Sequence, residues 1–344
     1  MNPVRLLPVF LLACVASGCG VDRSKAVDEL FAAYSGDVPG ASVLVIRDGE
    51  KILAKNYGLA NVESQTAVTS ETNFRLASVT KQFTAAAARL LGERRRLALD
   101  DPVRTHFPEL PAFTEGITIR QLLNHTSGIE DYEPLYELEL PNQVTDAGVA
   151  DILAGTEGTY FPPGTDYRYS NSAYALLSQL VERLSGQTFG AFLDQNIFSP
   201  LGMSNTVAHV DGVTTVPNRA FGYTVEDGVV EPSDQSPWSA VLGDGGVYSS
   251  VNELYLWDQA QYEGGLLSLD LRALSETPGL EDYGFGLRID TYKGHRRIHH
   301  SGSTSGFRNF MQRFPDARLS VIVLTNRAAP DVQSLAEQVA DLYL

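Results

Sequence analysis

Two runs rich in apolar and β-branched residues occupy positions 41–49 and 50–58 and meet at the dipeptide Asp48-Gly49. Asp-Gly is a strong signal for a tight turn between antiparallel strands, because both positions accept a positive φ. Four more runs of the same kind lie near the other end of the chain, at 283–290, 296–302, 307–314 and 319–326. The pattern therefore predicts strands at both ends of the chain.

Helical patterns fill most of the remaining sequence. A short amphipathic segment at 24–36 precedes the first strand, and a closing helix is expected over 331–344. From Ser78 onward the pattern changes to helix, with the strong helix formers Ala85 to Ala88. Helical or loop segments rich in proline and glycine then continue to about residue 265.

These patterns predict one α+β domain over residues 38–344. Its mostly antiparallel sheet is built from both termini, at about 38–77 and 280–344, and is flanked by helices. A large helical insertion, at about 96–265, separates the two parts of the sheet. We expect residues 19–37 to form an N-terminal segment and helix in front of this domain.

Composition and charge exclude several classes of protein. The 344 residues are 43% hydrophobic and 20% charged, which is ordinary for a folded globular chain. There are 26 Lys and Arg against 42 Asp and Glu, giving a net charge of −16. This excess of negative charge repels phosphate backbones, so we do not expect a nucleic-acid partner.

The first 18 residues have the pattern of an export signal. Arg5 precedes an apolar run from Leu6 to Val15, which is too short to span a bilayer comfortably. The following Ala16-Ser17-Gly18-Cys19 resembles a bacterial lipobox, in which Cys19 becomes the lipidated first residue. We therefore expect an exported protein anchored by lipid to a bacterial membrane, on the periplasmic side; the alternative is a plain cleaved signal. Cleavage would remove Cys14, so no intramolecular disulfide is expected.

The first candidate for chemistry is the pair Ser78 and Lys81. Their spacing places both side chains on one helical face, at the point where the helix begins. The positive end of the helix dipole and the apolar surroundings favour a neutral Lys81 amine, which can take the serine proton before the hydroxyl attacks a carbonyl. The alternative is a capping Ser78 with Lys81 reaching solvent.

A second candidate lies at Tyr169-Ser170-Asn171, between a Pro/Gly turn and a helix with clear apolar periodicity. Tyr169 and Asn171 share a face if this short segment is extended. The alternative is turn chemistry, in which Asn171 or Ser172 caps the helix and Tyr169 packs.

The third candidate is the segment HHSGSTSGF, which begins at His299. Alternation on a strand places His300 and Gly302 on one face, and Gly302 leaves room for the backbone of a ligand. His295, His299 and His300 suggest a metal site. Strand residues four apart are about 13 Å distant, however, too far to share one ion. We expect no metal.

The three elements S-x-x-K, Y-x-N and H-x-G, in this order, resemble the serine β-lactamase and penicillin-binding-protein superfamily, in its class C-like branch. The likeness extends over about residues 38–326. It includes the stretches PGASVLVIRDG, ITIRQLLNHTSGI, FPPGTDYRYSNSAYALL, GDGGVYSS and LSVIVLTN.

The resemblance implies acyl transfer. Ser78 attacks an amide or ester carbonyl, Lys81 and Tyr169 move the proton, and Asn171 orients the lysine and the substrate. The backbone N–H groups of Ser78 and Ser303 form the oxyanion hole. Water then hydrolyses the acyl-enzyme.

The third element departs from true class C β-lactamases, which carry K-T-G. Here His300 occupies the lysine position, and a histidine is only partly charged near neutral pH. The resemblance implies that His300, Ser301 and Gly302 bind substrate, as in D-alanyl-D-alanine carboxypeptidases, D-aminopeptidases and some esterases of this branch. Ser301 and Ser303 are candidates to bind a substrate carboxylate or carbonyl, and Arg288 is another; its alternative is a solvent-facing arginine.

Class A β-lactamases activate the deacylating water with a glutamate downstream of their second motif. Glu137 and Glu139 precede Tyr169 and do not fit, so the resemblance implies that Tyr169 serves deacylation. His125 suggests a base for Ser78, but the turn that follows it favours a structural histidine. Tyr167 is expected to pack beside the second motif.

The sequence therefore predicts a serine hydrolase that acts on amide or ester bonds, with D-amino-acid peptides or esters as the expected substrates. One alternative is a class C-like β-lactamase. An alternative of another class is a non-catalytic envelope protein that binds peptidoglycan or a protein. No cofactor motif is evident, because GDGGV lacks the strand and helix setting of a dinucleotide site.

Overall fold

A computed structural model describes residues 22–135, 142–262, 265–266 and 268–344. The predicted export signal and Cys19 lie outside these residues, as do Glu137 and Glu139, so the statements about them stay predictions. In the described part of the chain, no helix is both long enough and apolar enough to cross a membrane.

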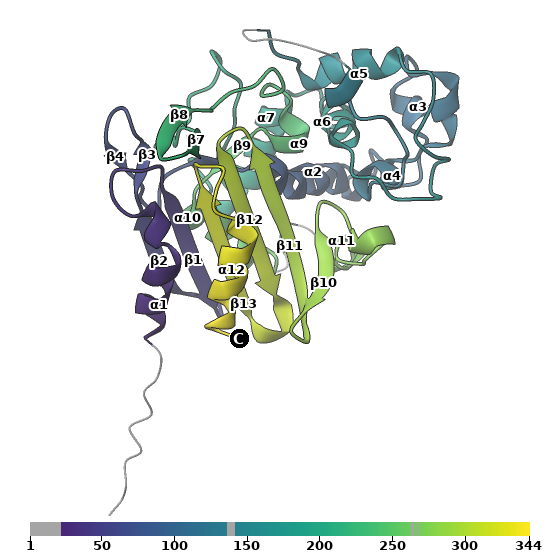
Figure 1. Cartoon of the computed structure of the whole chain (residues 1–344). Coiled ribbons are helices and arrows are strands. Elements are labelled where there is room, and N and C mark those ends of the chain that lie inside the picture. Colours follow the sequence, from purple (N-terminus) through teal and green to yellow (C-terminus); the bar gives the residue numbers. More distant parts are fainter. Residues whose placement is uncertain (1–21, 136–141, 263–264, 267) are drawn as a thin grey trace, which may run out of the picture.

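A six-stranded antiparallel sheet forms the centre of the molecule, in the order β10-β11-β12-β13-β1-β2 (Figure 1). Strand β1 pairs with β13, so the two ends of the chain share one sheet. This confirms the predicted α+β fold. The strands are β1 Ala41–Arg47, β2 Glu50–Tyr57, β10 Arg288–Tyr292, β11 His295–Thr304, β12 Phe307–Phe314 and β13 Leu319–Thr325.

The turn between β1 and β2 has the geometry that its sequence predicts. Asp48 and Gly49 have φ of 52° and 85°, the left-handed values that a tight two-residue hairpin requires. The strand predicted over 283–290 begins only at Arg288, so its first half is wrong. The cause is a tight turn: the N–H of Gly284 donates to the Leu287 carbonyl at 2.8 Å and Tyr283 pairs with Arg288, so residues 284–287 reverse the chain before the strand begins.

Helices cover both faces of the sheet. On one face, α1 Arg23–Leu30 and α12 Val332–Asp341 bury Val27, Val339 and other apolar residues against the strands. On the other face lie α2 Lys81–Glu93 and α10 Val251–Ala260, whose apolar residues belong to the larger core. The two terminal helices are shorter than predicted.

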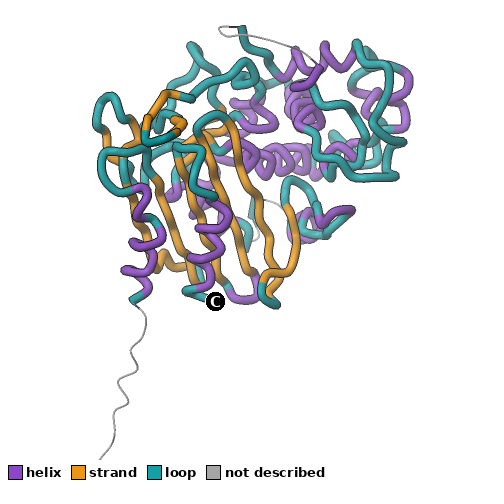
Figure 2. The backbone as a smooth tube through the Cα atoms, viewed as in Figure 1, coloured by secondary structure: helices purple, strands orange, loops and turns teal. Residues whose placement is uncertain are grey.

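The region between the two halves of the sheet consists of helices joined by long loops, as Figure 2 shows. Its helices are α3 Val103–His106, α4 Ile119–Leu123, α5 Asp146–Ala154, α6 Asn171–Ser185, α7 Phe189–Leu193, α8 Ser199–Leu201 and α9 Leu242–Gly245, and α11 Leu269–Ser275 follows. Short strands interrupt this region, a feature that the sequence did not indicate. The short strands of the chain are β3 Leu59–Asn61, β4 Thr66–Ala67, β5 Phe74–Arg75, β6 Val207–Ala208, β7 Tyr223–Glu226, β8 Val229–Pro232 and β9 Val247–Ser249.

Strand β11 packs directly against the turn that carries Ser78. A Cβ on Gly302 would lie 2.1 Å from the carbonyl oxygen of Leu76 and 3.3 Å from Cβ of Ala77. The space beside Gly302 is therefore filled by the protein's own backbone, and the interpretation that it admits a ligand backbone is wrong. Asn309 on the neighbouring strand donates to the Arg75 carbonyl at 2.8 Å and fixes the same turn.

We predict that Gly302→Ala destabilises the fold by about 2 kcal/mol, because the added methyl group must push β11 away from the Ser78 turn. Urea unfolding measures this change. Gly116→Ala is the matched control, since a Cβ there meets no atom within 4 Å. Equal stability of the two variants would contradict the close approach.

Candidate active site

Ser78 and Lys81 meet at the start of α2. A short 3-10 turn, Ala77–Thr80, leads into this helix, and Ala77 adopts the left-handed φ of 50° that a residue with a Cβ rarely takes. Lys81 Nζ lies 3.1 Å from Ser78 Oγ. The Lys81 side chain is fully buried, whereas Ser78 is partly exposed. The hydroxyl therefore faces solvent-accessible space while the amine behind it does not.

Lys81 Nζ has two further neighbours. It donates to Asn171 Oδ1 and to the backbone carbonyl of Asp244, both at 2.8 Å. An amide oxygen and a carbonyl oxygen can only accept, so they take two N–H bonds of the amine. In a neutral amine the lone pair is then left for Ser78, whose hydroxyl can donate into it. The geometry suits proton transfer from Ser78 to Lys81.

The second predicted element converges on the same amine. Lys81 Nζ lies 4.8 Å from the ring centre of Tyr169, and the buried Tyr169 hydroxyl has no hydrogen-bond partner among the described residues. Asn171 is the first residue of α6, and the helix is capped by Ser170 rather than by Asn171. The carboxylate of Asp131 accepts from the backbone N–H of Asn171 at 2.9 Å. This hydrogen bond helps to hold the side-chain amide of Asn171 beside Lys81.

His300, from the third element, is buried rather than open to a substrate. Its Nδ1 donates to the Ser301 carbonyl at 2.7 Å, and its Nε2 accepts from the Tyr283 hydroxyl at 2.8 Å. Burial lowers the pKa of His300 to about 3. The imidazole is therefore neutral at pH 7, not partly charged as the sequence suggested, and both nitrogens are bonded within the protein.

Ser78 and Ser303 line one narrow cleft of about 50 Å³, and the oxyanion hole formed by their backbone N–H groups stays a prediction. Gly302 is buried beneath it, and Ser301 is exposed but does not line it. Asn171 lines the same cleft.

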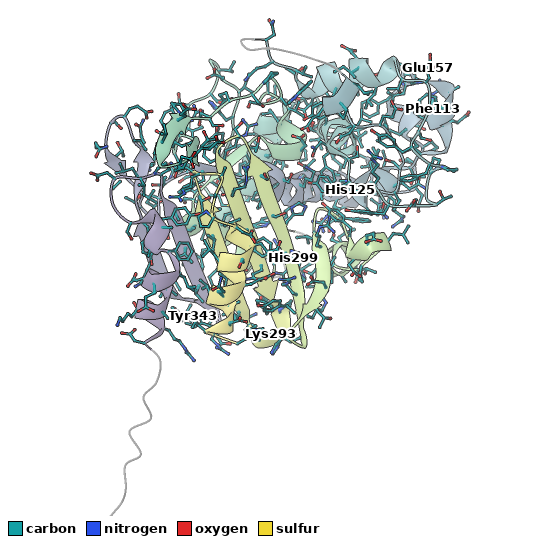
Figure 3. All side chains as sticks on the ribbon, viewed as in Figure 1. Phe113, His125, Glu157, Lys293, His299 and Tyr343 are labelled. Carbon is teal, nitrogen blue, oxygen red and sulfur yellow. The ribbon has the colours of Figure 1, made fainter. Side chains whose placement is uncertain are left out.

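Three other residues considered from the sequence lie close by. His125 is buried, and its Nδ1 accepts from the backbone N–H of Ser170 at 3.1 Å, so it holds the second element in place (Figure 3). Tyr167 packs edge-on against His125, with ring centres 6.0 Å apart. Arg288 donates to the Tyr167 hydroxyl at 3.1 Å and does not line the cleft.

The three elements thus meet around one amine and one hydroxyl, and comparison with known proteins agrees with this arrangement. A family model described as beta-lactamase matches residues 27–344. The chain belongs to the beta-lactamase family. Its members include the penicillin-binding proteins, and the chain is a hydrolase of this family in the class C-like branch.

Two curated members of the family and one solved structure show the degree of similarity. Penicillin-binding protein 4* of Bacillus subtilis is 30% identical over 312 residues, covering 83% of this chain and 68% of that protein. A D-aminopeptidase of Brucella anthropi is 30% identical over 304 residues, and the match covers 84% of this chain but only 56% of the peptidase. The octameric penicillin-binding protein homologue from Pyrococcus abyssi superposes with a TM-score of 0.83 at 28% identity, covering 93% of this chain and 76% of its own.

Several residues of this beta-lactamase-family site were not identified from the sequence. Tyr132 and Trp238 pack edge-on as part of the cleft wall, with ring centres 5.2 Å apart, and Glu133 lies beside Asn171. The carboxyl group of Asp244 accepts from the Tyr132 hydroxyl at 2.7 Å, and burial raises its pKa. Of these four residues, only Asp244 could have been noticed in the sequence, because it lies in the family-like stretch GDGGVYSS.

In the described residues, no group of three or more His, Cys, Asp or Glu side chains is placed to hold a metal ion. Two of the histidines near the third element, His295 and His299, are four residues apart on a strand, which separates them by about 13 Å. His299 belongs to the sheet (Figure 3), and its Nε2 lies 3.3 Å from an oxygen of Asp290.

We predict that the free energy of unfolding falls as the pH is lowered from about 6.5 toward 3, because an unfolded chain protonates His300 near the ordinary pKa of 6.5 and the folded one does not. One such group contributes a slope of about 1.4 kcal/mol per pH unit. His300→Gln should flatten the slope, measured by urea unfolding at several pH values. His295→Gln, on the same strand, is the control, and equal slopes in all three proteins would contradict a neutral buried His300.

Proposed function

We propose that this hydrolase cleaves amide bonds of small D-amino-acid derivatives that carry a free amino group, through an acyl-enzyme on Ser78. The observation that carries the proposal is the carboxylate of Glu133 in the cleft beside Asn171. The D-aminopeptidase relative supports the substrate class. Because the chain spans only 56% of that peptidase, similarity alone does not assign the activity of the peptidase to this chain.

The charge of the cleft favours a cationic end of the substrate. Glu133 and Asp244 both line the cleft, and Asp131 lies next to them. Among the described residues that line the cleft, the one arginine is Arg75, which is buried and donates to the carbonyls of Ser239 at 2.9 Å and Gly245 at 3.4 Å. A substrate ammonium is attracted by these carboxylates, whereas a substrate carboxylate is repelled.

The partial desolvation of Glu133 strengthens this preference. Burial, followed by the charges of Asp244 and Asp131, raises its pKa. An incoming ammonium offsets this repulsion and favours the charged carboxylate. Glu133 also accepts from Asn171 Nδ2 at 3.4 Å, so the group that recognises the amine is adjacent to the group that orients Lys81.

The chemistry follows from the contacts of Lys81. Ser78 Oγ gives its proton to the Lys81 amine and bonds to the substrate carbonyl carbon. The resulting oxyanion lies toward the backbone N–H groups of Ser78 and Ser303, and each such donor contributes about 3 kcal/mol in enzymes where one has been removed. The carbon–nitrogen bond then breaks, and the leaving amine takes the proton from Lys81 by way of the Tyr169 hydroxyl.

Water completes the reaction by the reverse path. Tyr169, whose hydroxyl has no partner among the described residues, takes a proton from a water molecule that attacks the acyl carbon and passes its own hydroxyl proton to the Lys81 amine. The bond to Ser78 Oγ breaks, the serine regains its proton from Lys81, and the carboxylic acid leaves. This arrangement of a nucleophile with two proton carriers favours an enzyme over a non-catalytic envelope protein.

The neutral His300 argues against β-lactamase activity as the main function. A β-lactam carries a carboxylate, and the position that offers it a lysine in class C enzymes holds here a buried histidine bonded to Tyr283. We therefore expect slow turnover of nitrocefin and faster turnover of D-phenylalanine p-nitroanilide. Faster turnover of nitrocefin would contradict the proposal.

We predict that Glu133→Gln raises KM for D-phenylalanine p-nitroanilide about tenfold, because one charge-assisted contact to the ammonium is lost. KM for the N-acetyl derivative, which has no charge, should change little. Glu115→Gln, at an exposed position outside the cleft, is the matched control. An equal loss on both substrates would assign Glu133 to positioning Asn171 and not to recognising the amine.

A further inference from the structure

A second and larger cavity lies in the helical region, away from Ser78. It has a volume of about 620 Å³ and is lined by residues of α5, α6, α7, β6 and α9. The four helices lie in the upper part of Figure 1. It shares no lining residue with the cleft of Ser78. We call it the α6–α7 pocket and define it by the apolar side chains of Phe189, Val207 and Leu242 and the acidic side chains of Asp146, Glu182 and Asp194.

The size and lining of the α6–α7 pocket suit a small organic molecule. Binding sites for such ligands usually measure about 300–1,000 Å³ and have mainly apolar walls with a few polar groups. Phe189, Phe198 and Ala208 are buried and form part of the wall, while Val213, which also lines the pocket, is 77% exposed. An apolar ligand would cover this exposed surface.

All the charged groups in the described lining are carboxyl groups, because no lysine, arginine or histidine lines the pocket. An anionic ligand would meet repulsion without any compensating cation. A neutral ligand would leave the carboxylates facing an apolar surface. A cation with an apolar body satisfies both features of the lining.

The acidic groups are held in place by the protein. Asp146 accepts from Ser178 Oγ at 2.6 Å and from the backbone N–H of Leu242 at 2.8 Å. Glu182 lies one turn of α6 beyond Ser178 and accepts from the Phe189 N–H and from Gln179, both at 2.7 Å. One turn advances about 5.4 Å, so the carboxyl group of Asp146, which belongs to α5, and that of Glu182 lie beside neighbouring turns of α6.

Glu182 is the better partner for a cation. Burial raises the pKa of Asp146 to about 7, so that this group is largely protonated at slightly acidic pH. Glu182 is only partly buried, and its two hydrogen bonds leave lone pairs free on both oxygens.

We propose that the α6–α7 pocket is a second binding site, and that it takes a small hydrophobic primary amine. The apolar body lies against Phe189, Val207 and Leu242, and the ammonium group binds the Glu182 carboxylate. This site is separate from the cleft of Ser78 and does not depend on the function proposed for that cleft.

Isothermal titration of the full chain with hexylamine, hexan-1-ol and hexanoate tests the proposal. Ser78 is first blocked with a fluorophosphonate and Glu133 is replaced by glutamine, so that binding in the cleft does not contribute. We expect saturable binding of hexylamine, about tenfold weaker binding of the alcohol and no binding of hexanoate. Glu182→Gln should reduce the affinity for hexylamine to that for the alcohol.

Ala191→Trp fills the pocket from α7 and should abolish hexylamine binding, while the same substitution at the exposed helical residue Ala273, outside the pocket, should not. Thermal unfolding confirms that each variant is folded. Hexylamine binding that survives Ala191→Trp, or hexanoate binding as tight as that of hexylamine, would overturn the proposal. So would the absence of saturable binding to the parent protein.

Discussion

The hydrogen bonds of Lys81 hold the centre of this molecule together. One buried amine contacts the hydroxyl of Ser78 in the 3-10 turn before α2, the amide of Asn171 at the start of α6 and the carbonyl of Asp244 in α9. A buried amine without partners is strongly unfavourable, so these contacts favour the assembly of the three elements around it. The catalytic geometry and the stability of the helical region therefore depend on the same contacts.

Much of the fold could be predicted because it rests on local signals. Asp48-Gly49 sets its own turn, and the apolar runs of β12 and β13 define strands without help from distant residues. The start of β10 could not be predicted, because residues 284–287 form a turn in which the Phe285 N–H donates to the Ser275 carbonyl at 3.1 Å. That contact joins two segments that are separate in the sequence pattern.

The residues of the candidate site also fall into those that local motifs predict and those that only tertiary packing places. Ser78, Lys81, Tyr169 and Asn171 are visible in short motifs, and the structure brings them together. Glu133 has no motif, and its place beside Asn171 arises from tertiary packing alone. The neutral state of His300 likewise requires Tyr283, whose hydroxyl approaches it only in the folded chain. A histidine in a motif thus says little about its charge until its burial is known.

The most direct test of this account is the rate at which a fluorophosphonate labels Ser78, followed by intact-protein and peptide mass spectrometry. If Lys81 takes the serine proton, Lys81→Met should slow labelling about 10³-fold, while Lys25→Met, at an exposed lysine, should leave the rate unchanged. Ser78→Ala should remove the label. Labelling of Lys81→Met at the parent rate, or a label that persists in Ser78→Ala, would contradict the central claim.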